Sequence, residues 1–201
     1  MINTIVFDIG NVLADFRWNE YLDDCGYDQE TKEKIARATV LSNRWNELDR
    51  GLEDEEELFR QCCEAEPSVA QEIMTLFNNI SLLVREFDYS TELIKKLKAN
   101  GYKVYLLSNY ARFSYKYAME NFDFIKHVDG GIISYEIQHT KPEPAIYEAL
   151  INKYNINPKE AVFLDDLAAN LEGAKPFGFS TIQVKSMDQA LEDLRKLGVR
   201  I

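Results

Sequence analysis

Polar side chains that can do chemistry occur at or near the ends of several short apolar runs. These residues are Asp8, Ser108, Asn109, Lys141, Asp165 and Asp166. If the apolar runs are parallel strands of one sheet, their carboxyl ends meet at a single edge, which is where open sheets of this kind bind ligands. The sequence therefore predicts one site, built from residues that are far apart in the chain.

The two adjacent carboxylates are the most informative of these residues. Asp165 and Asp166 follow the apolar run Val162–Leu164, and two carboxylates at a buried strand end repel each other unless a cation lies between them. A solvated helix N-cap is the alternative interpretation. Asp8 also follows an apolar run and precedes Gly10, so it either takes part in catalysis or caps a turn.

The other polar residues are weaker signals when each is taken alone. Ser108 and Asn109 are also compatible with a simple turn after a strand. Lys141 stands within Thr140–Pro144, where two prolines stiffen the backbone, and a lysine that is merely at the surface does not need such a setting. The two histidines of the chain have no Ser or Cys beside them in a nucleophile motif, so we do not expect a catalytic triad.

Alternating strand and helix patterns are expected to position these residues. Strands are predicted at 4–7, 103–108, 131–134, 161–164 and 181–184. Helices are predicted at 90–100, at 112–121, at 144–153, after Asp166 through Ala174, and in a last segment that ends near Leu197. Strands that alternate with helices and are apolar on both faces indicate a parallel sheet covered on both sides. The predicted fold class is α/β, with a Rossmann-like core.

The net charge of the chain is unevenly distributed. The 201 residues include 34 Asp and Glu against 23 Lys and Arg, for a net charge of −11. Residues 15–90 hold 19 acidic and 8 basic residues, whereas 1–14 and 91–201 together hold 15 of each. Because the pattern from about Phe16 to Asn79 is helical, we predict an all-helical insert at 15–90 after the first strand. The α/β core would then consist of 1–14 and 91–201.

The composition excludes several classes of protein. Hydrophobic residues make up 46% of the chain and charged residues 28%, which is ordinary for a globular protein. An acidic chain is a poor ligand for nucleic acids and for anionic membranes, so we expect neither as a partner. Three cysteines without the spacing of a disulfide framework or a metal site, and no signal-peptide pattern, favour a soluble cytoplasmic protein.

Four motifs resemble those of the haloacid dehalogenase superfamily of hydrolases, both in their order and in their approximate spacing. They are Asp8-Ile9-Gly10-Asn11-Val12, Ser108-Asn109, Lys141-Pro142, and Phe163-Leu164-Asp165-Asp166 with Asn170. The match covers the whole predicted core. The insert after the first motif resembles the small cap of subfamily I, which includes many sugar-phosphate phosphatases. The resemblance implies a hydrolase that cleaves phosphate monoesters.

The resemblance also implies a role for each motif residue. Asp8 is similar to the nucleophile that attacks phosphorus and forms an aspartyl-phosphate, a task that suits a carboxylate ionised at neutral pH. Ser108 and the backbone amide of Asn109 resemble groups that hold phosphoryl oxygens. Lys141 resembles the residue that neutralises charge on the nucleophile and on the transferring group. The residues that resemble Mg²⁺ ligands are Asp8, the Gly10 carbonyl, Asp166, and Asp165 either directly or through water.

One position departs from the pattern of most phosphatases in the superfamily. They carry a second Asp two residues after the nucleophile, as general acid and then base, and Gly10 stands there in this chain. Loss of such a group typically costs about 10²–10⁴-fold in rate. Three hypotheses remain open. The leaving group departs with little help, as in an anomeric sugar phosphate or an acyl phosphate; Asp15 or a residue of the insert substitutes; or the protein mainly binds phosphate.

The form of the first motif and the acidity of the insert both bear on the substrate. Asp-x-Gly-Asn-Val resembles the form found in a branch with bacterial glucose-1-phosphate-type phosphatases, which favours the first hypothesis. An insert with a net charge of −11 disfavours polyanions, whereas Mg²⁺ and Lys141 can shield a monophosphate. We therefore expect a small phosphorylated metabolite, such as a sugar phosphate, as the substrate.

Other functions are compatible with parts of the pattern. A metal-independent 2-haloacid dehalogenase shares the fold and the Asp nucleophile, but it has no use for Asp165 and Asp166 beside that nucleophile. A weakly active phosphate-binding or assembly protein would explain Gly10. A receiver domain is disfavoured, because its acidic pair follows the first strand and because it lacks an insert.

Overall fold

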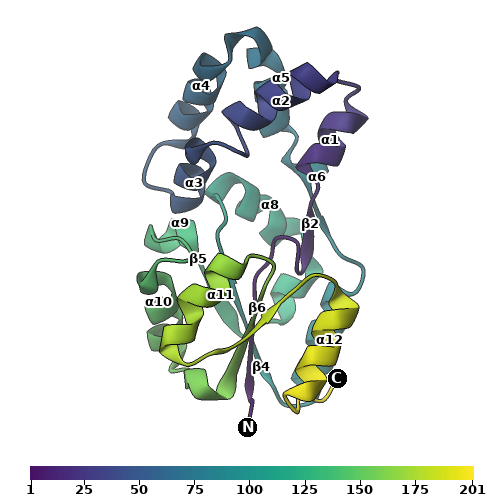
Figure 1. Ribbon diagram of the computed structural model, residues 1–201, viewed down its shortest axis with the longest axis vertical. Coiled ribbons are helices and arrows are strands. Elements are labelled where there is room, and N and C mark those ends of the chain that lie inside the picture. Colours follow the sequence, from purple (N-terminus) through teal and green to yellow (C-terminus); the bar gives the residue numbers. More distant parts are fainter.

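The core of the protein is a five-stranded parallel sheet. The computed structural model describes residues 1–201, and the strands lie in the order β5-β4-β1-β6-β7 (Figure 1). Their bounds are β1 Thr4–Phe7, β4 Lys103–Ser108, β5 Gly130–Ile133, β6 Ala161–Asp165 and β7 Ser180–Gln183. Phe7 at the end of β1 pairs with Leu106 on one side and with Leu164 on the other. The predicted α/β fold class is confirmed, although β5 and β7 each begin one residue earlier than predicted.

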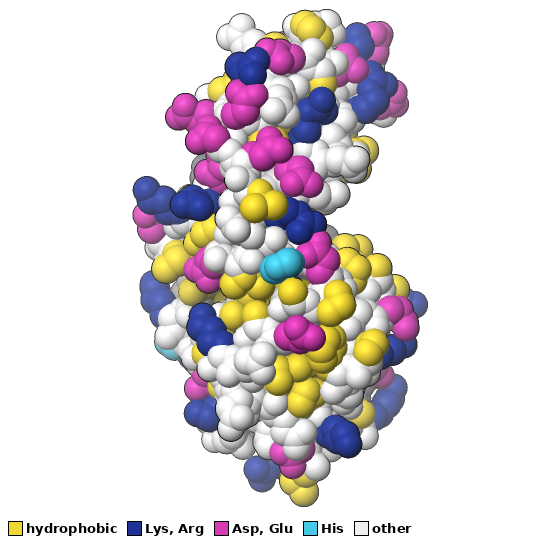
Figure 2. All heavy atoms as spheres, turned by 90° about the vertical axis from the view of Figure 1, so that its left-hand side faces the viewer, with side chains coloured by type: hydrophobic (Ala, Val, Ile, Leu, Met, Phe, Trp, Pro, Cys, Tyr) yellow, Lys and Arg dark blue, Asp and Glu magenta, His cyan; other side chains and the backbone are white.

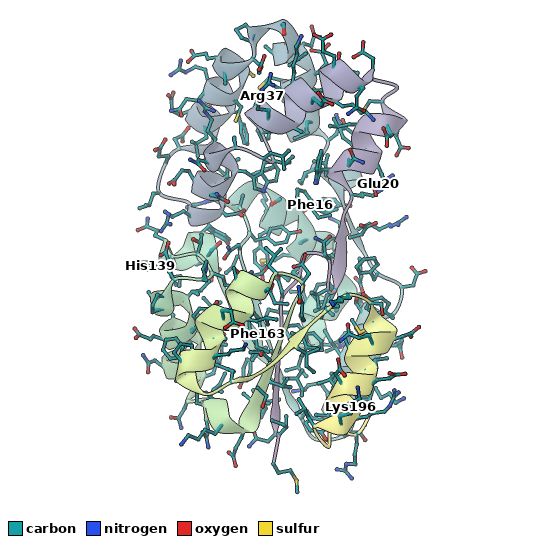
Figure 3. The ribbon with its side chains drawn as sticks, viewed as in Figure 1. Phe16, Glu20, Arg37, His139, Phe163 and Lys196 are labelled. Carbon is teal, nitrogen blue, oxygen red and sulfur yellow. The ribbon has the colours of Figure 1, made fainter.

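Both faces of this sheet are buried. Successive strand residues point to opposite faces, and they belong to two different hydrophobic cores. Ile5 and Phe7 belong to a core of 39 buried residues, whereas Val6 belongs to a second core of 13. Phe163 of β6, labelled in Figure 3, also lies in the second core. The first core includes residues of α7 Ser90–Ala99, α8 Arg112–Asn121 and α12 Met187–Lys196. The second includes residues of α10 Pro144–Tyr154 and α11 Ala168–Ala174.

The segment between β1 and α7 forms a separate layer above the sheet in Figure 1. Its helices are α1 Trp18–Asp24, α2 Gln29–Ala38, α3 Asn43–Arg50, α4 Glu55–Ala65, α5 Ala70–Asn78 and α6 Ile80–Leu83. The prediction of an all-helical insert is wrong at its base, where β2 Ala14–Phe16 and β3 Val84–Glu86 form an antiparallel ribbon. Strands of three residues are too short to leave an alternating pattern in the sequence.

Short helical turns connect the larger elements. They are α9 Ser134–Ile137 and the 3₁₀ turns η1 Pro67–Val69, η2 Asp123–His127, η3 Pro158–Glu160 and η4 Lys175–Phe177. Three of the 3₁₀ turns carry a proline in the first two positions, where its fixed φ suits a helical start. None of the helices is long and apolar enough to cross a membrane.

The helix starts of the insert account for part of its acidity. Asp28 caps α2 by accepting a hydrogen bond from the N–H of Thr31 (2.8 Å), and Asp54 caps α4 by accepting one from the N–H of Glu57 (3.1 Å). Three glutamates fill the first turn of α4, where the partial positive charge of a helix start stabilises them. Figure 2 shows acidic side chains gathered on the upper part of the molecule. The acidic residues of these caps and first turns stabilise the starts of α2 and α4, whether or not a substrate is bound.

The C-terminal end of α3 connects the insert to the core. The Ser134 hydroxyl, which belongs to the core, donates a hydrogen bond to the carbonyl of Asp49 (2.5 Å). The next residue, Arg50, forms an ion pair with Glu143 in the loop before α10. These contacts hold α3 in a defined position above the carboxyl edge of the sheet.

The close approach of insert and core predicts a stability effect at Gly51. This residue ends α3 with a φ of +68°, and an added Cβ would lie 2.8 Å from the Cβ of Tyr135. Gly51→Ala is therefore expected to lower the free energy of unfolding by about 2–4 kcal/mol, from left-handed strain and steric overlap combined. Gly101→Ala is the matched control, because Gly101 has a φ of +88° but no atom within 4 Å of an added Cβ; its expected loss is about 1 kcal/mol. Equal losses in urea denaturation would contradict this account of the contact.

Candidate active site

The carboxyl edge of the sheet gathers polar residues from three neighbouring strands. Asp8 follows β1, Ser108 ends β4 and Asp165 ends β6. Lys141 comes from the loop before α10, and Asp166 follows directly after β6. One carboxylate oxygen from each of the three aspartates lies within 4.8 Å of the others. The structure thus places these five sequence-predicted residues together.

The two oxygens of the Asp8 carboxylate have different surroundings. Oδ1 accepts hydrogen bonds from the backbone N–H of Ile9 (2.7 Å) and from the Ser108 hydroxyl (2.6 Å), and it lies 2.9 Å from Nζ of Lys141. No buried side-chain oxygen in the protein lacks a partner, and Asp8 lines a cavity. Oδ1 is therefore held by three donors, whereas Oδ2 is open to a ligand in that cavity.

Lys141 is buried between two carboxylates. Its side chain is 1% exposed, and its Nζ lies 2.9 Å from Oδ1 of Asp8 and 2.7 Å from Oδ2 of Asp165. Burial alone would lower the pKa of the Lys141 ammonium, but the two carboxylates raise this pKa above its ordinary value. Lys141 therefore carries its positive charge at neutral pH.

Asp165 is engaged with Lys141 and with the start of the following helix. Oδ2 accepts a hydrogen bond from Lys141, Oδ1 accepts one from the N–H of Leu167 (2.8 Å), and both oxygens lie 3.0 Å from the Asn170 amide nitrogen. Asp165 is fully buried, whereas Asp166 is partly exposed and lines the cavity. The oxygens of Asp166 are thus more accessible to a cation than those of Asp165.

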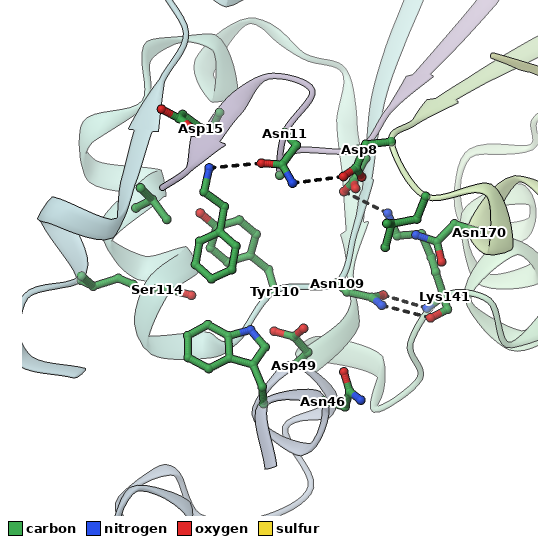
Figure 4. A pocket seen from close by; sticks show the side chains of 18 residues that line it. Asp8, Asn11, Asp15, Asn46, Asp49, Asn109, Tyr110, Ser114, Lys141 and Asn170 are labelled. Atoms are coloured by element: carbon green, nitrogen blue, oxygen red, sulfur yellow. Dashed lines mark hydrogen bonds and ion pairs between the residues drawn. The ribbon is translucent and has the colours of Figure 1, made fainter. Parts of the chain in front are cut away.

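The side chain of Asn109 is bonded to the backbone of Lys141. Its Oδ1 accepts a hydrogen bond from the Lys141 N–H (2.7 Å), and its Nδ2 donates one to the Lys141 carbonyl (3.0 Å), as the paired dashed lines in Figure 4 show. This pair of hydrogen bonds orients Lys141 toward Asp8. The backbone N–H of Asn109 has no hydrogen-bond partner within the protein, which leaves it available to an anion.

Burial changes the acidity of the carboxyl groups at this edge. It raises the pKa of Asp8 to about 7, while Lys141 lowers this pKa and Asp165 adds to the increase. Burial also raises the pKa of Asp166, although the hydrogen bond that Asn11 donates to it (3.0 Å) offsets part of this increase. A divalent cation among these carboxylates would favour their ionised forms. The atoms that could bind a cation here are all oxygens, and hard cations such as Mg²⁺ prefer oxygen ligands.

A cavity of about 260 Å³ lies between this edge of the sheet and the insert (Figure 4). Gly10 and Asn109 belong to its core-side wall. The rings of Phe16 and Trp45 have centroids 5.6 Å apart and provide an aromatic surface on the insert side, and Figure 3 shows Phe16 at the junction of insert and core. The lining residues that the insert contributes are Asp15, Phe16, Trp45, Asn46, Asp49, Ile80 and Val84.

Four polar residues of the cavity wall are absent from the sequence-based prediction: Asn46, Asp49, Tyr110 and Ser114. Asp49 lies four residues after Trp45 on α3 and so shares its helix face. That spacing identifies a face, but the sequence does not tell which face of α3 meets the cavity. Tyr110 follows the predicted pair and donates its backbone N–H to Oγ of Ser134 (2.9 Å). No motif marks any of the four residues.

Comparisons with known proteins identify relatives of nearly the whole chain. A family model for haloacid dehalogenase-like hydrolases matches residues 2–178. D-ribitol-5-phosphate phosphatase from Bacteroides thetaiotaomicron is 30% identical over 201 aligned residues, which cover 91% of this chain and 92% of that protein.

Solved structures with a similar fold include two enzymes. A haloacid dehalogenase-family enzyme from Bacteroides thetaiotaomicron, in complex with magnesium and inorganic phosphate, is 27% identical with a TM-score of 0.72, covering 92% of this chain and 95% of that one. L-2-haloacid dehalogenase from Xanthobacter autotrophicus, with chloropropionic acid covalently bound, has a TM-score of 0.65 at 18% identity, covering 100% and 85% of the two chains. At that identity the likeness shows a shared fold.

The family match spans all four motifs named from the sequence. It begins before Asp8 and extends beyond Asn170, and the predicted resemblance is confirmed. The match also includes every residue described at the carboxyl edge of the sheet. The chain therefore belongs to the haloacid dehalogenase-like family of hydrolases.

Proposed function

We propose that this hydrolase is a Mg²⁺-dependent phosphatase that cleaves small phosphate monoesters through an aspartyl-phosphate on Asp8. The observation that carries the proposal is the Asp8 carboxylate, which three donors hold by one oxygen while the other faces the cavity. A carboxylate fixed in this way is oriented for attack on phosphorus. The similarity to a sugar-alcohol phosphate phosphatase, and to an enzyme solved with magnesium and phosphate, supports it.

The proposed reaction has two displacement steps at phosphorus. In the first, the Asp8 carboxylate attacks phosphorus and the bond to the leaving oxygen breaks. In the second, water attacks the aspartyl-phosphate, which releases phosphate and restores Asp8. Lys141 lowers the energy of the charge that builds up between Asp8 and the transferring group. The backbone N–H of Asn109, which has no partner within the protein, is placed to hold a phosphoryl oxygen. The Ser108 hydroxyl would hold one only by giving up the hydrogen bond that it donates to Oδ1 of Asp8.

Three oxygen donors are proposed to hold the Mg²⁺. They are the carboxylates of Asp8 and Asp166 and the carbonyl of Gly10, all of which line the cavity. When bound, the ion supplies Lewis-acid stabilisation of charge on the phosphoryl oxygens. We assign Asp165 to the positioning of Lys141, because a direct bond to the metal would replace hydrogen bonds that its oxygens already accept.

The cavity favours a small polar substrate. Its volume of about 260 Å³ is below the range of roughly 300–1,000 Å³ that is typical of sites for drug-sized ligands. The wall combines the aromatic rings of Phe16 and Trp45 with the exposed amide of Asn46. A sugar or sugar-alcohol phosphate matches this combination, because its carbon skeleton packs on aromatic rings while its hydroxyls bond to amides.

Removal of divalent cations tests the proposed function. Phosphate release from a panel of sugar, sugar-alcohol and alkyl monophosphates is measured before and after EDTA treatment. We expect EDTA to abolish release, because the ion held by Asp8, Asp166 and the Gly10 carbonyl would supply the Lewis-acid stabilisation of the phosphoryl oxygens, and Mg²⁺ to restore it. Phosphate release that survives chelation would contradict the proposal. Chloride release from L-2-chloropropionate in EDTA would indicate a dehalogenase instead.

A further inference from the structure

The loop that follows β1 offers no proton donor beside Asp8. Gly10 lines the cavity but has no side chain. The amide of Asn11 is engaged on both sides, since Nδ2 donates to Asp166 (3.0 Å) and Oδ1 accepts from the N–H of Phe16 (3.4 Å). An alkyl or sugar oxygen needs a proton as its bond to phosphorus breaks, because an alkoxide is strongly basic. The donor must therefore come from another part of the cavity wall.

Four carboxyl groups line the cavity, and three of them already have an assigned partner or role. Asp8 and Asp166 are the proposed nucleophile and metal ligand. Asp15 forms an ion pair with Arg85 (3.2 Å) across the β2–β3 ribbon, which directs its carboxylate along that ribbon. Asp49 forms no ion pair and is the remaining carboxyl group on the wall.

The fold holds Asp49 rigidly over the reaction centre. Its carbonyl accepts the hydrogen bond from the Ser134 hydroxyl, and the adjacent Arg50 pairs with Glu143, so this part of α3 is fixed to the core on two consecutive residues. Figure 4 shows the Asp49 carboxyl group projecting into the cavity from the wall opposite Asp8. A side chain in this position faces the space that the leaving group must occupy.

We propose that Asp49 is the general acid and base of this enzyme, supplied by the insert in place of the side chain that Gly10 lacks. This inference rests on the phosphatase function proposed above. As Asp8 bonds to phosphorus, the ester P–O bond breaks with its electron pair on the leaving oxygen, which takes the Asp49 proton and departs as an alcohol. The Asp49 carboxylate then takes a proton from the attacking water. The P–O bond to Asp8 breaks, and phosphate and the Asp8 carboxylate are released.

The acidity of Asp49 agrees with this role. Burial raises the pKa of Asp49 to about 7, Asp8 adds to the increase, and Lys141 and the backbone amide of Ala111 oppose it. A carboxyl group of this strength exists in both protonation states near neutral pH. It can therefore donate a proton in the first step and accept one in the second.

The test compares aryl phosphates that differ in their leaving group but little in size. kcat/KM of the Mg²⁺-loaded enzyme is measured with p-nitrophenyl phosphate, whose leaving group is a stable anion, and with phenyl phosphate, whose leaving group needs a proton. Asp49→Asn preserves the shape of the side chain. We expect it to lower kcat/KM by about 10²–10³-fold for phenyl phosphate and by less than about tenfold for p-nitrophenyl phosphate. Equal losses for both substrates would overturn the proposal, since a structural role lowers both alike.

Two further variants sharpen the test. An added Cβ at Gly10 meets no atom within 4 Å, and the backbone there is not left-handed, so Gly10→Asp is compatible with the fold. In the Asp49→Asn background, Gly10→Asp is expected to raise kcat/KM for phenyl phosphate at least about tenfold, and no recovery would count against a missing proton donor. Asp15→Asn is the matched control and is expected to affect both substrates equally. A selective loss in Asp15→Asn instead of Asp49→Asn would overturn the assignment.

Asp8→Asn separates this inference from the proposed function. If Asp8→Asn retains turnover of either aryl phosphate, the aspartyl-phosphate mechanism fails, whatever Asp49 does. If Asp8→Asn loses turnover and Asp49→Asn shows equal losses for both substrates, the phosphatase function stands and only the role of Asp49 is overturned.

Discussion

Replacement of Asp8 by asparagine is expected to abolish turnover while the protein stays folded. An amide cannot form an acyl phosphate in place of the carboxylate, so phosphate release should fall by at least about 10⁴-fold. The amide oxygen can still accept the hydrogen bonds that Ile9 and Ser108 donate to Oδ1 of Asp8. Phosphate release and circular dichroism are measured on the same preparation.

The same substitution is expected to leave stability equal or increased at pH 8 without metal. Burial raises the pKa of Asp8 from 3.8 to about 7 in the folded protein, so the folded state binds this proton more tightly than the unfolded chain does. The ionised carboxylate therefore lowers stability progressively as the pH rises from about 4 to about 7, and asparagine removes that cost. Stability is measured by urea denaturation in EDTA. A variant that is inactive because it unfolds would indicate a structural role, and persistent turnover would show that Asp8 is not the nucleophile.

Lys141→Met is expected to remove activity and much of the stability together. Methionine has a similar length but no charge, so Asp8 and Asp165 lose the cation that lies 2.9 Å and 2.7 Å from them. Breaking a buried ion pair from one side typically costs about 3–5 kcal/mol in the free energy of unfolding. Loss of one electrostatic donor at the reacting group typically costs about 10²–10³-fold in kcat. Urea denaturation and phosphate release measure the two effects.

A second substitution separates these two losses. Asp165→Asn in the Lys141→Met background removes one of the two unpaired buried charges, and its amide oxygen can still accept the hydrogen bond from the N–H of Leu167. The double variant is expected to regain part of the lost free energy of unfolding, since Asp8 stays unpaired, but none of the activity. Recovery of activity would contradict the role assigned to Lys141. An unchanged stability would show that the charge of Asp165 is not the source of the destabilisation.

The residues at the carboxyl edge were predictable because the apolar runs that carry them are unambiguous. β1 and β6 are apolar on both faces, so each strand had to lie inside a covered parallel sheet, and the polar residue after it had to lie at the ligand-binding edge. Asp8, Ser108 and Asp165 were located by this reasoning. Lys141 was singled out by the prolines that flank it, since its loop follows no strand directly, and its role came from the resemblance.

What the sequence did not reveal depends on contacts between distant segments. Asp165 pairs with Lys141, and Asp166 is the more accessible carboxylate. Both facts follow from side-chain directions at a strand end and from the position of Asn170. Asp49 reaches the cavity because the end of α3 docks on the core through the Ser134 hydroxyl and the Arg50–Glu143 ion pair. Neither the local pattern around residue 49 nor its charge distinguishes it from the other acidic residues of the insert.

The β2–β3 ribbon shortens the loop that must close before the sheet can form. β1 pairs with β4, with Thr4 opposite Lys103, so the unfolded chain must bring together segments roughly a hundred residues apart, at an entropic cost that grows with loop length. Once Ala14 pairs with Glu86, the remaining loop is only about 30 residues, which reduces that cost by about 1 kcal/mol. An insert that forms early thus acts as a nucleus that brings β1 within reach of β4. The segment that closes over the cavity in the native enzyme would also accelerate the folding of the sheet beneath it.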